Sequence, residues 1–210
     1  MRNSAALRDT LDLMRTAYIG MGGNLASWAG TPEITLAAAA LRLESLGRLV
    51  CRSSLYSTEP VGFAAQPRFV NAVVGLETEL EPRELLEGLL AIEHEFGRDR
   101  TSGIPNGPRR LDLDILLFGD LQISEPGLEI PHPRLAERAF VLIPLDEVAP
   151  EAAVSRGKTV AQLLEDLLEG SQAEAGAVAR IKTDAWETRT QALTDSQATL
   201  AGNSGVAAIS

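Results

Sequence analysis

Hydrophobic and polar positions along the chain follow two periods, and their order predicts an α+β protein. Some segments alternate apolar with polar residues or are apolar throughout, as strands are, while others repeat apolar residues every three to four positions, as helices do. The expected strands are 16–21, 48–55, 69–80 and 111–119, and the expected helices are 31–47 and 82–97. Two helices therefore alternate with four strands in the order β-α-β-β-α-β.

Capping residues support both helices. Thr31 before Pro32 predicts a helix N-terminus, because threonine is a favoured N-cap and proline fits the first helical position. Pro82 opens the second helix in the same way, and Gly47 and Gly97 are typical C-terminal stops. The β-α-β-β-α-β order is that of the ferredoxin-like sandwich, so we expect this fold.

Smaller elements are expected after the fourth strand. They are an added small hairpin around Ile123 and 128–130, C-terminal helices at 133–137 and 160–168, and an apolar run, 139–148, that Pro144 breaks.

Three regions follow from this pattern. Residues 1–15 form an amphipathic N-terminal extension, and 16–169 form the folded domain. Residues 170–210 are rich in Ala, Ser, Thr and Gln with few core formers, so we expect a weakly ordered tail.

Composition narrows the function classes. The chain has 210 residues, of which 45% are hydrophobic, and a net charge of −10, which disfavours a nucleic-acid binder. A single cysteine, Cys51, permits no internal disulfide and fits a reducing compartment. No apolar run approaches the roughly 18 residues of a membrane span, and no secretory signal precedes the domain. We expect a cytoplasmic protein that binds neither nucleic acid nor membrane.

Two aspartates carry the most specific chemistry. Asp112 and Asp114 are two residues apart at the start of an expected strand, so both side chains point to the same face. Adjacent like charges are costly unless a cation neutralises them, and Mg²⁺ typically takes one or two carboxylates with water and phosphate oxygens. Arg109 and Arg110 directly upstream could hold such phosphates. In the structural alternative the two aspartates simply face solvent.

A histidine and several arginines lie in the same half of the chain. His132 stands between two prolines, which stiffen its position and suit a phosphate contact or a proton-handling group. Arginines suited to bidentate phosphate contacts gather there, although some could pair with surface glutamates. They are Arg98, Arg100, Arg109, Arg110, Arg134 and Arg138.

The remaining candidates lie near the first and third strands. Phe69 is a core residue by default, whereas Asn71 on the same strand face needs hydrogen-bond partners if it is buried. Gly22-Gly23-Asn24 predicts a tight turn that presents Asn24. Two long loops, 57–68 and 98–110, are candidates for functional loops.

Together these segments resemble the 6-hydroxymethyl-7,8-dihydropterin pyrophosphokinase family of the folate pathway. The matching pieces occur in the family's order over about residues 17–150. They are 17–25, 53–62, 66–72, 92–93 with 97–98, 107–114, and 130–134 followed by 138–140.

The resemblance implies transfer of the terminal diphosphate of ATP to the hydroxymethyl group of a reduced pterin, giving AMP. It implies that Asp112 and Asp114 bind two Mg²⁺ ions and that Arg98 and Arg109 act with them in catalysis. The implied ATP contacts are Glu93, Arg98, Arg109, Ile115, His132 and Arg138. The implied pterin contacts are Gly23, Asn24, Thr58, Val61, Phe69, Asn71 and Phe140, with the two phenylalanines on either side of the ring.

By this resemblance the partners are ATP and 6-hydroxymethyl-7,8-dihydropterin, and the protein is expected to be a monomer, with a second folate-pathway enzyme as an open alternative partner. The sequence departs from the family at four positions. An aromatic residue is replaced by Asn106, a serine by Gly23, a threonine by Arg110 and a loop arginine by Gly127.

Two other functions remain open at this level. Nucleotidyl transfer on a ferredoxin-like sheet would explain the paired aspartates but not Phe69, Asn71 and the His132 turn. A small-molecule-binding regulatory module on the same fold would not explain why two aspartates lie beside an arginine-rich loop. Mg²⁺ dependence and the identity of the acceptor separate the three.

Overall fold

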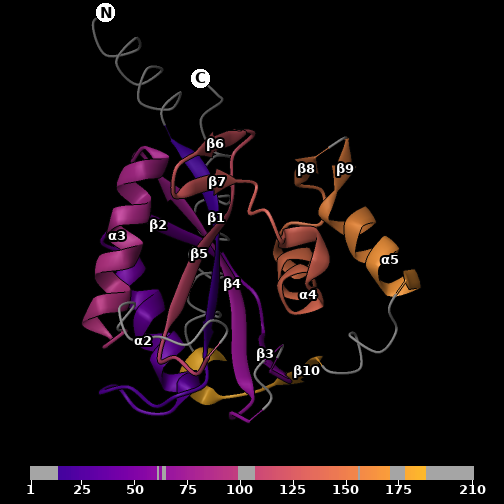
Figure 1. Ribbon diagram of the computed structural model, residues 1–210. Coiled ribbons are helices and arrows are strands. Elements are labelled where there is room, and N and C mark those ends of the chain that lie inside the picture. The colour runs from indigo at the N-terminus through magenta and orange to yellow at the C-terminus, as the bar shows by residue number, and fades with distance from the viewer. Residues whose placement is uncertain are drawn as a thin grey trace, which may run out of the picture.

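A central antiparallel sheet organises the computed structural model, which describes residues 14–60, 62, 65–98, 107–155, 157–170 and 178–187 (Figure 1). Its strand order is β10-β3-β4-β1-β5, and β2 also pairs with β4. The strands are β1 (Arg15–Gly23), β2 (Arg48–Arg52), β3 (Leu55–Thr58), β4 (Phe69–Thr78), β5 (Asp112–Phe118) and β10 (Val178–Ile181). The ferredoxin-like prediction is confirmed, because β5, β1, β4 and the β2–β3 pair follow one another in the antiparallel order of that fold.

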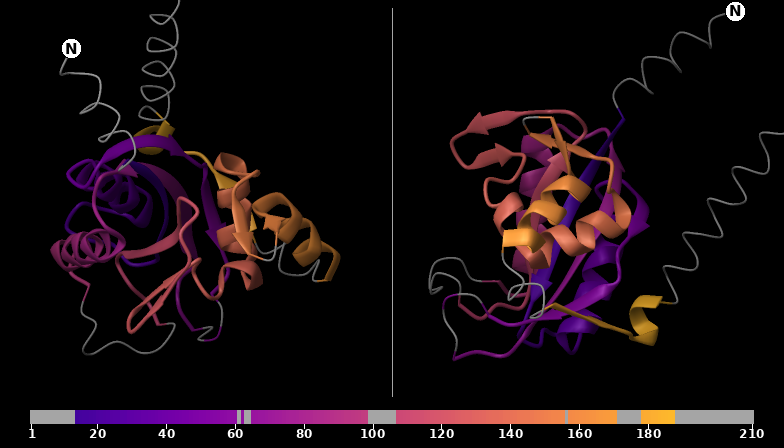
Figure 2. Two further views of the ribbon diagram at one scale, coloured as in Figure 1. Left: turned by 90° about the horizontal axis from the view of Figure 1, so that it is seen from above. Right: turned by 90° about the vertical axis from the view of Figure 1, so that its right-hand side faces the viewer.

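Helices cover both faces of this sheet. Helices α2 (Pro32–Leu43) and α3 (Pro82–Glu95) lie on one face, and α4 (Ala139–Val148) and α5 (Val160–Gly170) lie on the other (Figures 1 and 2). Each face has its own hydrophobic cluster, one containing Leu36 and Leu89 and the other containing Val73 and Leu142. Because both faces are covered, nearly all of β4 is buried, and the strand is apolar rather than alternating.

The expected helix starts are confirmed. Thr31 occupies the N-cap position of α2 with Pro32 at its first turn, although its side chain makes no capping hydrogen bond. Helix α3 has a capping box, in which the backbone N–H of Glu81 donates to the Glu84 carboxylate at 2.9 Å.

Four local predictions need correction. The expected strand 48–55 is two strands, because Ser53 turns the chain between β2 and β3 and exchanges hydrogen bonds with Val73. The glycines of the expected turn, Gly22 and Gly23, are the last residues of β1. Pro144 does not break its segment, because α4 continues through it. The helix expected at 133–137 is a single 3₁₀ turn at Leu135–Glu137.

Short elements complete the described part. The expected hairpin is β6 (Ile123–Glu125) with β7 (Leu128–Ile130), and a second hairpin, β8 (Ala153–Ser155) with β9 (Lys158–Thr159), precedes α5. Within the described ranges, none of the helices combines the length and apolar character that crossing a membrane requires.

The expected tail is not uniformly weakly ordered. Residues Val178–Ile181 form β10 on the free edge of β3, and Trp186 is buried with 2% of its surface exposed. This short stretch gains strand structure because the edge of β3 supplies the hydrogen-bond partners that composition cannot reveal. The predicted extension 1–15 lies outside the described residues up to residue 13.

Candidate active site

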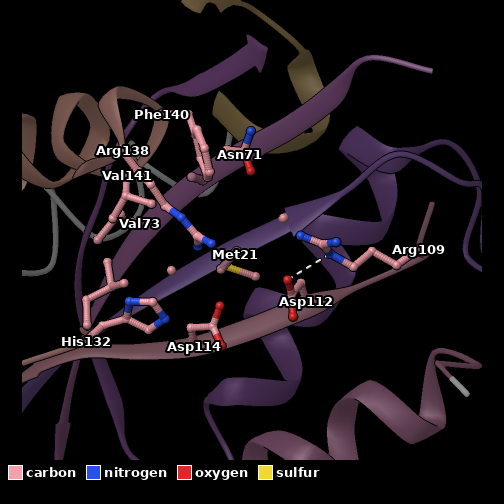
Figure 3. Close-up of a pocket in the computed structure, with 14 residues that line it drawn as sticks. Met21, Asn71, Val73, Arg109, Asp112, Asp114, His132, Arg138, Phe140 and Val141 are labelled. Carbon is pink, nitrogen blue, oxygen red and sulfur yellow. Dashed lines mark ion pairs between the residues drawn. The ribbon is translucent and has the colours of Figure 1, made fainter. Parts of the chain in front are cut away.

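The site is a pocket where the ends of β1, β4 and β5 meet the start of α4 (Figure 3). The pocket opens to solvent. Its lining contains polar groups from two strands, from the loop before β5, from one turn and from the start of one helix. They include Asn71, Arg109, Asp112, Asp114, His132 and Arg138, with Phe140 as the aromatic residue.

Two glycines of β1 form the floor of the pocket. In the sheet, Gly22 lies between Asn71 of β4 and Asp112 of β5, and Gly20 lies between Val73 and Asp114. A Cβ atom at Gly22 would lie 2.8 Å from the Asn71 Oδ1 atom, which is closer than such atoms approach. The absence of side chains at Gly20 and Gly22 therefore leaves space between the aspartates and β4.

Asp112 and Asp114 point to the same face, as predicted. Both line the pocket at the start of β5 (Figure 3). Burial, followed by the neighbouring charge of Asp112, raises the pKa of Asp114 to about 6, while Arg98, Arg138 and Arg109 oppose this shift. The pair is thus a site of concentrated negative charge inside a partly desolvated pocket.

A buried glutamate holds one of the arginines beside this pair. Glu93 of α3 is 1% exposed, and its carboxylate accepts hydrogen bonds from Arg98 at 2.6 Å and from the backbone N–H of Leu113 at 2.8 Å. Arg98 in turn pairs with Asp112. Burial disfavours the charge of Arg98, but Asp112 and Glu93 outweigh it and raise its pKa. Glu93 therefore fixes Arg98 against β5, and its expected contact with ATP stays a prediction.

Two further arginines reach the same space. The Nε atom of Arg109 lies 2.7 Å from the Asp112 Oδ2 atom. Arg138, at the N-cap of α4, points from the opposite side into the space above the aspartates (Figure 3). Burial and the nearby Arg134 lower the pKa of Arg138, yet a guanidinium stays charged at neutral pH. Two guanidinium groups thus line one pocket of an acidic protein, and a third, that of Arg98, reaches Asp112 from outside the lining.

The carboxylates of Asp112 and Asp114 suit a hard divalent cation. In the part of the chain that the structure describes, no group of three or more His, Cys, Asp or Glu side chains is placed to enclose a metal ion. A cation held here would therefore complete its coordination shell with water or ligand oxygens, as Mg²⁺ typically does. The donor set fits Mg²⁺ shared with a phosphate ligand better than a structural metal.

His132 faces the pocket in its neutral form. Its Nδ1 atom accepts a hydrogen bond from the backbone N–H of Arg134 at 3.2 Å, which assigns the ring proton to Nε2. Burial and Arg138 lower the pKa of His132 below its ordinary value, although Asp112 opposes them. The imidazole can therefore donate one hydrogen bond to a ligand oxygen without carrying a charge.

The β4 wall offers a polar pair and an aromatic ring. Asn71 donates from Nδ2 to the Thr58 hydroxyl at 2.8 Å, and both side chains are buried. Phe140 of α4 also lines the pocket, beside Asn71 (Figure 3). Phe69 lies under the Arg109 guanidinium, 4.8 Å from ring centre to the Arg109 Cζ atom, and it is not among the lining residues.

Asn24 connects two loops instead of facing the pocket. Its amide donates to the Gln66 side chain and the Pro67 carbonyl, both at 3.0 Å, and its Oδ1 accepts from the Arg109 N–H at 2.8 Å. A Cβ atom at Gly23 would overlap the carbonyl oxygen of Arg110. Both residues thus let the chain after β1 approach the segment that carries Arg109, and their expected pterin contacts stay predictions.

The structure brings seven of the expected residues into one pocket and leaves others outside it. Ile115 is buried in the core of the α2–α3 face, so its side chain does not line the pocket. Val61 lies outside the described residues, as do Arg100 and Asn106. Of the remaining arginines, Arg110 is exposed and donates to the carbonyls of Gly97 and Ala26, and Arg134 lies 3.9 Å from Glu137.

Sequence reasoning missed the apolar part of the lining. Gly20, Met21, Val73, Leu116 and Val141 contribute to the pocket without chemistry of their own. One signal was available, because Gly20 and Gly22 alternate on a strand, and glycine inside a strand often marks a close approach of a ligand.

Comparisons with known proteins agree with this geometry. The model of the 7,8-dihydro-6-hydroxymethylpterin-pyrophosphokinase (HPPK) family matches residues 18–150. A 2-amino-4-hydroxy-6-hydroxymethyldihydropteridine pyrophosphokinase from Pseudomonas aeruginosa is 44% identical over 154 residues, which cover 72% of this chain and 91% of the relative. The enzyme of the same name from Haemophilus influenzae is 42% identical over 72% of this chain and 92% of its own length.

Solved structures agree on the fold. A crystal structure of Plasmodium falciparum HPPK-DHPS superposes with a TM-score of 0.65 over 81% of this chain at 16% identity. This chain spans about half of that longer protein, 48% of its length. With the family model covering more than half of its length and relatives above 40% identity, the chain belongs to the 7,8-dihydro-6-hydroxymethylpterin-pyrophosphokinase family.

Proposed function

We propose that this pocket transfers pyrophosphate from ATP to the hydroxymethyl group of 6-hydroxymethyl-7,8-dihydropterin in folate biosynthesis, releasing AMP. The observation that carries the assignment of roles is that one pocket holds the aspartate pair with Arg109 and Arg138, and Asn71 and Phe140 as its other polar and aromatic groups. Arg98 and Thr58 support these groups from outside the lining, through Asp112 and Asn71. One side of the pocket suits a triphosphate with its metal, and the other suits a flat polar ring.

On the phosphate side, the protein acts by positioning and by charge. Phosphoryl-type transfer needs no nucleophile from the protein, only an acceptor oxygen in line with the phosphorus and cations around the transferred group. Arg98, Arg109 and Arg138 supply fixed positive charge, and the neutral His132 donates to a phosphate or nucleotide oxygen.

Asp112 and Asp114 hold two Mg²⁺ ions in this proposal. Bound there, the ions would supply positive charge that neutralises the phosphates and lowers the pKa of the attacking hydroxyl group. Their charge would also release Arg98 and Arg109 from Asp112, which both arginines contact in the described structure. The two arginines would then be free to contact the substrate phosphates.

On the pterin side, stacking and an amide provide recognition. Phe140 offers a face for a flat ring, and Asn71, held by Thr58, presents its remaining amide groups to the polar edge of the pterin. Phe69 can add a second face once Arg109 moves off its ring.

The test is AMP formation from ATP and Mg²⁺, with and without 6-hydroxymethyl-7,8-dihydropterin. Wild-type protein should make AMP only with the pterin, and Asp112→Asn should lose at least a hundredfold in rate. Asp120→Asn is the matched control, because Asp120 is an exposed aspartate just beyond the other end of β5. Pyrophosphate release in place of AMP would favour nucleotidyl transfer, and binding without turnover would favour a regulatory module.

We also propose that the protein works as a cytoplasmic monomer. The single cysteine, Cys51, fits a reducing compartment. Sedimentation velocity at enzyme-assay concentrations should give a mass near the 22.4 kDa of one chain.

A further inference from the structure

Strand β3 carries Thr58, which belongs to the proposed pterin side of the site, but only a short pairing with β4 joins it to the sheet. β3 is four residues long and pairs with β4 at three positions, one of which places Tyr56 opposite Asn71. On its other side β3 pairs with β10 along its whole length, and Val178 lies opposite Thr58. Without β10, Thr58 would stand at the end of a short exposed edge strand.

Trp186 anchors the segment that contains β10. Its indole Nε1 donates to the Ser53 carbonyl at 2.8 Å, and the Arg52 guanidinium lies 3.7 Å from the centre of a Trp186 ring. Trp186 is 2% exposed and Arg52 is 7% exposed, so this is a buried contact. We call residues 178–187 the C-terminal segment, and it lies beyond residue 150, where the family match ends.

Helix α4 fixes the same strand from the other side. Glu147 accepts hydrogen bonds from the Ser54 N–H and hydroxyl, both at 2.7 Å, and from the Tyr56 hydroxyl at 3.0 Å. Arg180 of β10 approaches the same carboxylate at 3.8 Å. β3 is therefore held between α4, which carries Phe140, and the C-terminal segment.

From this arrangement we infer that the C-terminal segment is a positioning element for the pterin half of the site. It acts through β3 on the Thr58 hydroxyl, which fixes the Asn71 amide. Trp186 is its anchor, and it acts through other residues, because Ser53 and Arg52, which hold its indole, lie outside the pocket lining. The aspartates and arginines lie on β5, α4 and the adjoining loops, so the ATP half should not depend on the segment.

The first test replaces the anchor. Trp186→Ala should raise the KM for the pterin three- to tenfold and leave the KM for ATP within twofold. Trp28→Ala is the matched control, because Trp28 is the other tryptophan of the chain, is 68% exposed, and stacks on Phe96 just after α3. Trp186→Phe keeps a ring over Arg52 without the N–H donor and should fall between wild type and alanine.

A pair of truncated chains keeps the inference testable if the point variant folds poorly. A chain ending after Thr188 keeps the C-terminal segment, and one ending after Gly170 removes it. Equilibrium dissociation constants of the pterin and of an ATP analogue, measured by calorimetry, need no turnover. Only the shorter chain should bind the pterin more weakly, with ATP-analogue binding unchanged.

A double-mutant cycle tests the route through Thr58. Because Thr58→Val removes the acceptor for Asn71, the effect of Trp186→Ala on pterin affinity should shrink to less than twofold in that background. Equal losses for pterin and ATP, or unchanged affinities with only a lower melting temperature, would overturn the inference.

The inference rests on the proposed pterin side of the site, and the two can fail separately. If the proposed function is wrong, wild-type protein makes no pterin-dependent AMP. If only the positioning role is wrong, wild type is active and Trp186→Ala keeps its pterin KM.

Discussion

At the scale of single residues, the charge of Asp114 destabilises the metal-free protein. Its pKa is about 6 in the folded state against an ordinary 3.8, so the folded state retains a proton that the unfolded state has already lost. The proton on Asp114 therefore stabilises the folded state fully below pH 4, and this stabilisation is lost as the pH rises through 6. A shift of this size corresponds to a free energy on the order of 3 kcal/mol.

Asp114→Asn should therefore stabilise the metal-free protein at pH 8 relative to wild type, although it removes activity. The gain in unfolding free energy should be near zero at pH 4 and grow to about 1–3 kcal/mol by pH 7. Urea unfolding in EDTA across this range measures it. A gain that is the same at every pH would show that the charge of Asp114 is not responsible.

The glycines of β1 give a second prediction at this scale. Gly22→Ala places a methyl group against the Asn71 amide, so the pterin KM should rise at least tenfold. Gly20→Ala is the control, because its methyl group would meet the flexible end of Leu116 at 3.2 Å, and its effect should be about threefold or less. Steady-state kinetics with saturating ATP compares the two, and equal effects would argue against the clash with Asn71.

Residue-level chemistry was predictable where sequence spacing determines geometry. Asp112 and Asp114 share a face because a strand has a period of two, and Asn71 has the polar partner that its burial requires. Glu93 and Asn24 were expected to contact ligands, but their polar atoms bind Arg98 and the two loops. Such partners lie far apart in the sequence, so no local pattern reveals them.

At the scale of elements, Asn24 joins β1 to two loop ends. Asn24→Ala leaves the Arg109 N–H without its partner and releases Gln66 and Pro67, so it should lower the unfolding free energy by about 1–3 kcal/mol. It should also raise the KM for ATP, because Arg109 loses a support. Thermal unfolding and ATP kinetics test this prediction, with the exposed Ser45→Ala as control. Lower stability with unchanged ATP kinetics would limit Asn24 to a structural role.

Element order was predictable, but several boundaries were not. The β-α-β-β-α-β order follows from hydrophobic period and capping, both of which are local. The division of 48–55 at Ser53 depends on hydrogen bonds to Val73, and β10 depends on the edge of β3. Both are tertiary interactions, which explains why composition alone predicted a weakly ordered tail.

At the scale of the whole molecule, the acidic chain concentrates its functional positive charge in one pocket. The net charge is −10, yet Arg98, Arg109 and Arg138 meet beside two aspartates. Mg²⁺ bound only by the folded state should stabilise it by mass action, by about 2.7 kcal/mol at one hundred times its Kd. In a chain of this size, each kcal/mol of added stability raises the melting temperature by about 2–4 °C.

The melting temperature at pH 8 should therefore rise by several degrees with Mg²⁺ and an ATP analogue. In Asp112→Asn this rise should be mostly absent, whereas Asp120→Asn should behave as wild type. Differential scanning calorimetry with EDTA as the metal-free reference makes the comparison. An equal rise in all three proteins would place the metal elsewhere.

The burial of Trp186 also makes the protein its own optical reporter. A shielded indole emits at shorter wavelengths than a hydrated one, and the two tryptophans differ in this respect, at 2% and 68% exposure. In a Trp28→Phe background, all tryptophan emission would come from the β3 edge. A red shift of this emission at low denaturant, before the circular dichroism of the helices changes, would then record detachment of the C-terminal segment as a separate opening event. The dependence of this detachment on added pterin could be followed in real time.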